Sequence, residues 1–150
     1  MESQINKNFS PRSSCTTWQE LQLKQLMHSE NIPFEFQKIF SLPDRHYIVD
    51  FFLPQQTILE CSFSSMEKYY VAFRNKAVSL EAKSLQLKKH YSSLTMWVLF
   101  ETHSPILEPL TYTLIRLMPS VDHIFFSQQA LCEHLQRYFS LAAKTEEVIR

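Results

Sequence analysis

The chain contains no glycine in its 150 residues, although average usage would place about ten in this length. A Walker loop and a dinucleotide-binding fingerprint are therefore excluded, because both need glycine where the backbone closely approaches phosphate. Tight turns must instead use Pro, Asn, Asp and Ser, as at Pro43-Asp44 and Pro119-Ser120. The fold must connect its elements, and support any chemistry, without a glycine-rich phosphate loop.

The charge balance and the cysteines indicate which binding partners and which cellular compartment to expect. Fifteen basic and fifteen acidic residues cancel, so any binding of nucleic acid must come from a local patch. The three cysteines Cys15, Cys61 and Cys132 have neither zinc-knuckle spacing nor a disulfide pattern. We therefore expect a reducing, cytoplasmic environment. No apolar run approaches the roughly 18 residues of a membrane span, so we expect no membrane partner.

Apolar periodicity and turn residues predict an α/β fold in one domain. Residues 1–14 are polar and predict a flexible N-terminal tail, and residues 15–150 have the length of a single domain. The expected order is α-βββ-α-β-α-β-α, a mixed sheet with helices on both faces. The first three strands are expected to form an antiparallel meander, and the fourth to run parallel to the third because a helix connects them. The predicted elements are a helix from Thr17 to before Asn31, strands at 34–40, 47–53 and 57–63, a helix at 66–91, a strand at 94–100, a helix at 105–118, a strand at 121–126 and a helix at 128–143.

Two carboxylates stand inside apolar strand sequences. Asp50 lies between Val49 and Phe51, and Glu60 lies between Leu59 and Cys61. Carboxylates in such runs are costly unless they are paired, protonated or bound to a cation. Adjacent antiparallel strands can bring the two together beside a strand carbonyl, which is an all-oxygen site suited to Mg²⁺. The alternative is two acids at strand ends that face solvent or pair with a helix lysine.

The stretch Tyr47–Pro54 followed by Ile58–Ser62 resembles the core of the PD-(D/E)XK nuclease superfamily. That family carries an Asp on one strand of a hairpin, then a Glu or Asp, one variable residue and a Lys. The resemblance covers about residues 17–126 and implies a restriction endonuclease-like three-layer α/β/α core, shared by archaeal Holliday-junction resolvases. It also implies a DNA endonuclease that holds Mg²⁺ or Mn²⁺ through Asp50, Glu60 and the Cys61 carbonyl, with Glu20 supplying the first-helix acid.

The chain departs from this family at Ser62, where the motif lysine belongs. Some branches resemble this sequence in placing the lysine on the following helix, where Lys76 and Lys83 are the candidates for the catalytic role and Lys68 is a third. The alternative for each of these lysines is a solvated helix face, which is what most helical lysines occupy.

The partners that the resemblance implies are DNA, branched or double-stranded, and a second copy in a homodimer. Candidate nucleic-acid contacts are Gln37, Ser62, Arg74, Lys76 and Lys88; the helical basic residues would contact phosphate. The alternative function is a catalytically inactive relative of the nuclease fold that binds nucleic acid or another protein.

Overall fold

The computed structural model describes residues 18–64 and 69–149, with side chains described as far as Phe139. The predicted tail at 1–14, the helix-capping Thr17 and the candidate Lys68 lie outside these ranges.

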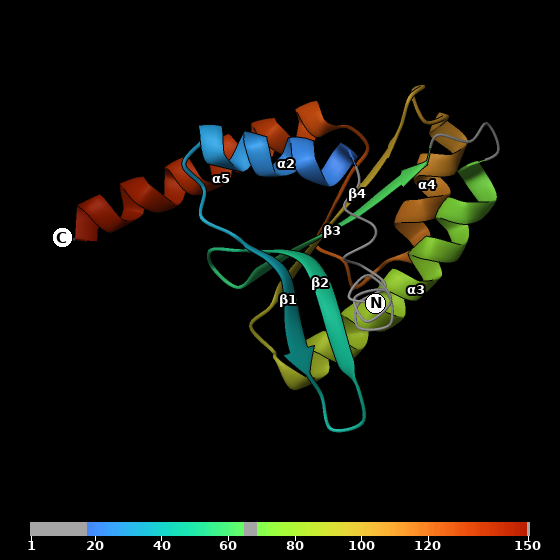
Figure 1. The fold of residues 1–150 in the computed structure, drawn as a ribbon, viewed down its shortest axis with the longest axis horizontal. Helices are drawn as coiled ribbons and strands as arrows, with labels where there is room; N and C mark the ends of the chain where they lie inside the picture. Colours follow the sequence, from blue (N-terminus) through green and yellow to red (C-terminus); the bar gives the residue numbers. More distant parts are fainter. Residues whose placement is uncertain (1–17, 65–68, 150) are drawn as a thin grey trace, which may run out of the picture.

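Four helices and five strands make up the described chain (Figure 1). Their order confirms the predicted α-βββ-α-β-α-β-α sequence of elements. They are α2 (Trp18–Ser29), β1 (Glu35–Ser41), β2 (His46–Leu53), β3 (Thr57–Ser64), α3 (Tyr69–His90), β4 (Thr95–Thr102), α4 (Glu108–Leu117), β5 (His123–Phe125) and α5 (Gln128–Ile149).

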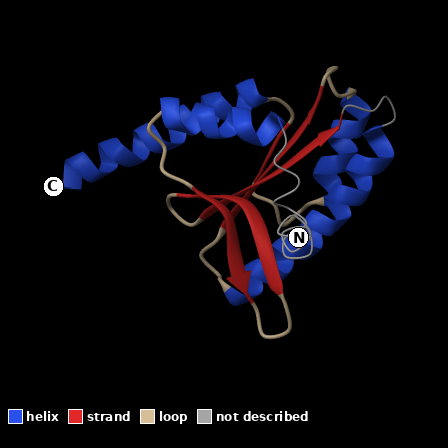
Figure 2. Ribbon diagram, in the orientation of Figure 1, coloured by secondary structure: helices blue, strands red, loops and turns tan. Residues whose placement is uncertain are grey.

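The strands form one mixed sheet in the order β1-β2-β3-β4-β5 (Figure 2). The β1–β2 and β2–β3 pairs are antiparallel, which confirms the meander. The β3–β4 and β4–β5 pairs are parallel, as expected of strands joined by the helices α3 and α4. The β2–β3 ladder is short, running from Leu53 opposite Thr57 to Phe51 opposite Leu59, whereas β3 pairs with β4 along its whole length.

Helices cover both faces of the sheet, and each face has its own apolar core. Helices α3 and α4 pack on one face, and α2 and α5 lie together on the other (Figure 1). The core under α3 and α4 includes Val49, Ile58, Phe73, Leu80, Met96, Val98 and Leu114. The core under α2 and α5 includes Leu23, Met27, Phe51, Leu59, Trp97, Leu99 and Leu135. Burial on both sides explains why β3 and β4 read as nearly continuous apolar runs.

Three predicted boundaries are wrong by several residues. Helix α4 begins at Glu108, because Leu107 is extended and Pro109 occupies the first turn, where a missing N–H costs nothing. Strand β5 has only three residues, and α5 continues past Ala143 to Ile149. Tyr91, expected as the last residue of the helix at 66–91, lies just beyond α3 and donates its hydroxyl to the Ser41 carbonyl at 2.7 Å.

Without glycine, polar side chains occupy the left-handed backbone positions. Asn31 has φ 55° and ends α2, where the Ile32 N–H donates to the Met27 carbonyl at 2.8 Å. Gln55 and Gln56 have φ 60° and 58° in the turn between β2 and β3. Leu53 pairs with Thr57 across this turn, so Pro54, Gln55 and Gln56 form a three-residue loop, and glycine usually takes the left-handed position of such a loop. This turn holds β2 and β3 in the register that carries the candidate site.

Candidate functional site

The candidate site forms where β2 and β3 separate. Their last backbone pair is Phe51 opposite Leu59, and the next residues in this register are Asp50 and Glu60. The Asp50 N–H donates to Glu60 Oε2 at 3.1 Å, and the Cys61 N–H donates to Asp50 Oδ2 at 2.8 Å. The two carboxylates therefore replace the next hydrogen bonds of the ladder and hold the strands together as they diverge. The predicted proximity of Asp50 and Glu60 is present in the structure.

At Asp50 and Gln37, the regular alternation of side chains between the two faces of the sheet is interrupted in β2 and β1. Val49 belongs to the core under α3, whereas Phe51, two residues later, belongs to the core under α2. Regular alternation would place both on one face. Opposite Asp50 lies Gln37, whose φ of 55° interrupts β1 between the flanking pairs Phe36–Phe51 and Lys38–Val49. Asp50 thus occupies a break in the pleat, which positions its side chain toward β3 rather than toward either core.

Lys83 reaches the carboxylates from α3. Its Nζ makes an ion pair with Glu60 Oε1 and donates to the Ile48 carbonyl at 2.6 Å. The side chains of Lys83 and Glu60 are 10% and 1% exposed, so the pair is buried. The Nζ also lies 5.7 Å from the centre of the Tyr47 ring. A cation at this position offsets the cost of burying the Glu60 carboxylate.

A second set of polar contacts holds helix α3 against the turn that precedes β5. Glu81 Oε1 accepts hydrogen bonds from the Ser120 N–H at 3.0 Å and the Ser120 hydroxyl at 2.6 Å. Lys88 donates to the Ser120 carbonyl at 2.5 Å and pairs with Asp122 at 2.7 Å. These contacts tie α3 to the turn before β5 and limit rotation of the helix that carries Lys83. Sequence reasoning missed them; the nearest signal was the Pro119-Ser120 turn dipeptide.

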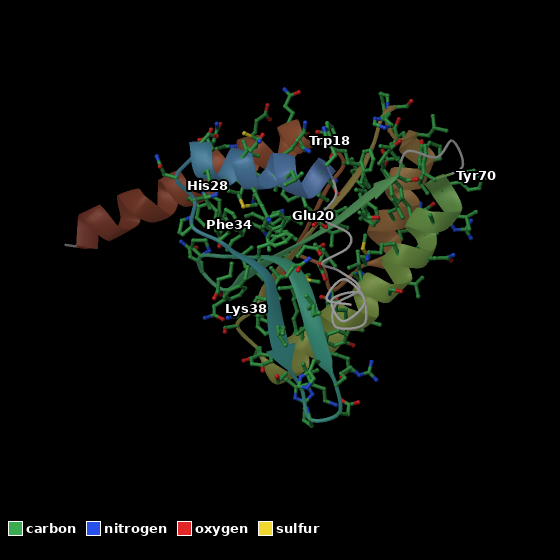
Figure 3. The ribbon with its side chains drawn as sticks, viewed as in Figure 1. Trp18, Glu20, His28, Phe34, Lys38 and Tyr70 are labelled. Carbon is green, nitrogen blue, oxygen red and sulfur yellow. The ribbon has the colours of Figure 1, made fainter. Side chains whose placement is uncertain are left out.

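Glu20, the predicted first-helix acid, lies on the inner side of α2. It is 8% exposed, and Figure 3 shows it between α2 and the sheet. Burial, together with the negative charges of Asp50, Glu60, Glu20 and Glu101, raises the pKa of the Cys61 thiol well above its usual value. The field of Glu20 therefore acts on the same part of β3 as the other two carboxylates.

The raised pKa makes Cys61 a poor nucleophile. In the folded chain, iodoacetamide at neutral pH is expected to alkylate Cys61 at least about tenfold more slowly than in the unfolded chain, because a buried thiol supplies little thiolate. Peptide mass spectrometry measures the rate, with half-buried Cys132 as the internal comparison. Rapid alkylation of Cys61 in the folded chain would contradict this expectation and make the thiol a candidate nucleophile again.

The other predicted site residues are distributed along α3 and β3. Lys76 is half-buried and lies seven residues before Lys83, about 10 Å along the helix axis. Arg74 is exposed, and Lys88 is engaged with Asp122 and Ser120 on the side of α3 that meets β5. Ser62 is half-buried on β3, two residues beyond Glu60. Of the predicted lysines within the described residues, Lys83 is the one that makes an ion pair with a site carboxylate, Glu60.

The donor chemistry of the site fits a hard divalent cation. Asp50, Glu60 and the Cys61 carbonyl offer oxygen ligands, and Mg²⁺ usually keeps several waters beside one or two carboxylates. Among the described residues, no three His, Cys, Asp or Glu side chains gather into a ligand set. Glu20 is therefore near the pair without completing a three-carboxylate cage. A cation here would depend on two side chains, a carbonyl and water.

Comparisons of this chain with protein families, with curated proteins and with solved structures found no match. In the described part of the chain, no helix has the length and apolar content needed to cross a bilayer. The geometry of the site is thus the basis for any functional conclusion.

Proposed function

We propose that this chain is a metal-dependent DNA endonuclease with a restriction endonuclease-like fold. The observation that carries the proposal is the contact of Lys83 with Glu60 beside Asp50. The resemblance in the sequence lacks its lysine at Ser62, and a lysine from the following helix supplies a cation to the same carboxylate. Two acids and a lysine thereby meet on the strands and helix that the resemblance implies.

The arrangement of elements supports the same proposal. An antiparallel β1-β2-β3 meander precedes a helical crossover to the parallel strand β4, with helices on both faces. The resemblance implies this order, and it implies that the acids lie on the second and third strands. Asp50 on β2 and Glu60 on β3 occupy those places.

The proposed roles follow from charge and position. Asp50 and Glu60 would hold the cation, which would supply a water of lowered pKa and a positive charge against the phosphate. The Lys83 Nζ is held between Glu60 and the Ile48 carbonyl, so its position is fixed before a phosphate arrives. A fixed donor of this kind stabilises developing negative charge without reorganisation.

An inactive relative that binds nucleic acid or protein is the second candidate. The observation that favours it is that Glu60 uses both oxygens within the chain, one for Lys83 and the other for the Asp50 N–H. An ion pair with a helix lysine is also what a purely structural role for the acids would produce. Activity of lysine variants separates the two candidates.

The test compares two lysines of the same helix. Lys83→Met is expected to lower the rate of metal-dependent nicking by about 10²-fold or more, the usual cost of removing one preorganised donor. Lys76→Met, which removes an equal charge two turns away, is expected to change the rate only a few-fold. The rates are measured on supercoiled plasmid and branched DNA with Mg²⁺ or Mn²⁺, at a temperature where circular dichroism shows each variant folded. Absence of nicking by the wild-type chain under all of these conditions contradicts the proposal and favours the inactive relative.

A further inference from the structure

Three aromatic rings meet beyond the candidate site, on the face covered by α2. Trp18 begins α2, Phe63 lies near the end of β3, and His103 follows β4. The ring centres of Phe63 and His103 are 5.1 Å apart, and Trp18 lies 5.8 Å from Phe63 and 6.4 Å from His103. We call these three residues the ring cluster.

The ring cluster is open to solvent on its Trp18 side. Trp18 is 54% exposed, and Figure 3 shows it at the end of α2. Its ring is inclined by 54° to Phe63 and by 50° to His103, so neither neighbour stacks flat against it. A large apolar ring held this way leaves a π-face available to a planar ligand.

The position of the ring cluster relates it to the carboxylates. Phe63 follows Glu60 by three residues on β3, which is about 10 Å along the strand, so its side chain lies on the α2 face whereas Glu60 contacts Lys83 on the α3 face. This part of β3 lies beyond the last β2–β3 pair, where the two strands have separated. The rings also lie at the carboxyl ends of the parallel strands β3 and β4, where open α/β sheets commonly bind ligands.

We propose that the ring cluster stacks on an unpaired nucleobase of a strand whose backbone passes the edge of the sheet where β2 and β3 separate at Asp50 and Glu60. This inference rests on the proposed function and names its substrate class: nucleic acid with a single-stranded segment, such as a flap, a branch or a frayed end. Every base has a π-face, and aromatic stacking binds single strands with little sequence preference. An intact duplex cannot use the cluster, because its bases already cover one another.

The negative charge of Glu101 near the ring cluster favours base stacking over phosphate contact. Glu101 lies on the same face, where Gln19 and Gln128 donate to it at 3.0 and 3.1 Å. A carboxylate there repels phosphate, so we expect binding with a shallow salt dependence. The slope of log affinity against log salt should be about −0.7 to −1.4, the value for one or two phosphate contacts on a single strand.

The chain contains a built-in probe for this test, because its two tryptophans differ in exposure. Trp97 is fully buried in the core, so quenching of tryptophan fluorescence by an oligonucleotide reports mainly on Trp18. With EDTA present to prevent cleavage, a single-stranded oligonucleotide is expected to quench the wild-type chain at concentrations where its blunt duplex does not. Quenching by neither oligonucleotide, or equal quenching by both, overturns the inference.

Variants identify the ring responsible. Fluorescence anisotropy of a labelled single strand is expected to show about tenfold weaker binding for Trp18→Ala, and near wild-type binding for Trp18→Phe, which keeps a ring. The matched control is Tyr112→Ala, since Tyr112 is also 54% exposed but lies on α4, across the sheet. Equal affinities for Trp18→Ala and Tyr112→Ala overturn the inference. Thermal melting checks that each variant is folded, and Trp18→Phe tests the ring should the alanine variant not fold.

The two proposals fail separately. Single-strand binding that depends on Trp18, without nicking by the wild-type chain, contradicts the endonuclease and leaves a nucleic-acid-binding module. Nicking that depends on Lys83, with no quenching by single strands, retains the endonuclease and contradicts the ring cluster as a base-stacking site.

Discussion

Asp50→Asn is expected to reduce metal-dependent nicking by about 10³-fold or more, because cation catalysis supplies several kcal/mol and each 1.36 kcal/mol is tenfold in rate. The amide oxygen of asparagine can still accept the hydrogen bond that the Cys61 N–H gives to Asp50 Oδ2. The substitution therefore removes the charge while keeping the link between β2 and β3. Initial rates of plasmid nicking with Mg²⁺ and with Mn²⁺ measure the effect.

Cation binding provides a second measurement that does not depend on catalysis. Mn²⁺ should raise the melting temperature of the wild-type chain, because a ligand that binds only the folded state stabilises it. The increase should disappear in Asp50→Asn and persist in Asp44→Asn, whose side chain is 67% exposed in the turn between β1 and β2. Unfolding of Asp50→Asn without metal would instead show that Asp50 is a structural residue.

Lys83→Met is expected to lower the free energy of unfolding by about 3–5 kcal/mol, the cost of removing one partner of a buried ion pair. The Glu60 side chain is 1% exposed, so its carboxylate would be left largely buried without the ion pair that offsets the cost of burying it. Denaturant titration followed by circular dichroism measures the change. This effect is large beside a typical total stability of about 5–15 kcal/mol.

A second substitution tests whether the unpaired Glu60 carboxylate causes the loss of stability in Lys83→Met. Lys83→Met combined with Glu60→Gln should recover most of the lost stability, because the buried Glu60 charge that Lys83 compensates is then also removed. Lys76→Met alone should change stability by less than about 0.5 kcal/mol, as is usual away from buried polar networks. A double variant as unstable as Lys83→Met would show that packing of the lysine chain, and not its charge, is the source.

The sequence predicted the sheet well because its signals were local. Alternating apolar residues and the turn dipeptides located the three meander strands, and a helix between β3 and β4 required them to be parallel. The same reasoning brought Asp50 and Glu60 together, since a tight turn leaves little freedom of register. What it predicted about their chemistry remains a prediction.

The choice between lysines could not be made from the sequence. Lys76 and Lys83 are seven residues apart, so they differ by only about 20° around a helix of 3.6 residues per turn. Periodicity places both on nearly the same side of α3. What separates them is their height along the helix relative to Glu60, and that depends on how the helix slides against the sheet. The contacts of Glu81 and Lys88 with the turn before β5 set that height.

The break in the pleat at Asp50 was equally hidden. A strand is read from the alternation of its side chains, and this assumes that the backbone stays extended. Gln37 leaves the extended region at φ 55°, a conformation that glycine usually signals and glutamine does not. The sequence therefore gave no signal that Gln37, the residue of β1 opposite Asp50, has a left-handed backbone conformation.

The turns made without glycine also affect the chain before it folds. A left-handed residue with a side chain costs the folded state about 1–2 kcal/mol, and the described residues contain four of them. Replacing glycine by a residue with a side chain, however, removes conformations from the unfolded ensemble and is worth about 0.4–1 kcal/mol where the native backbone permits it. A chain with no glycine anywhere has fewer unfolded states to lose. The entropy saved there offsets the strain held at Asn31, Gln37, Gln55 and Gln56.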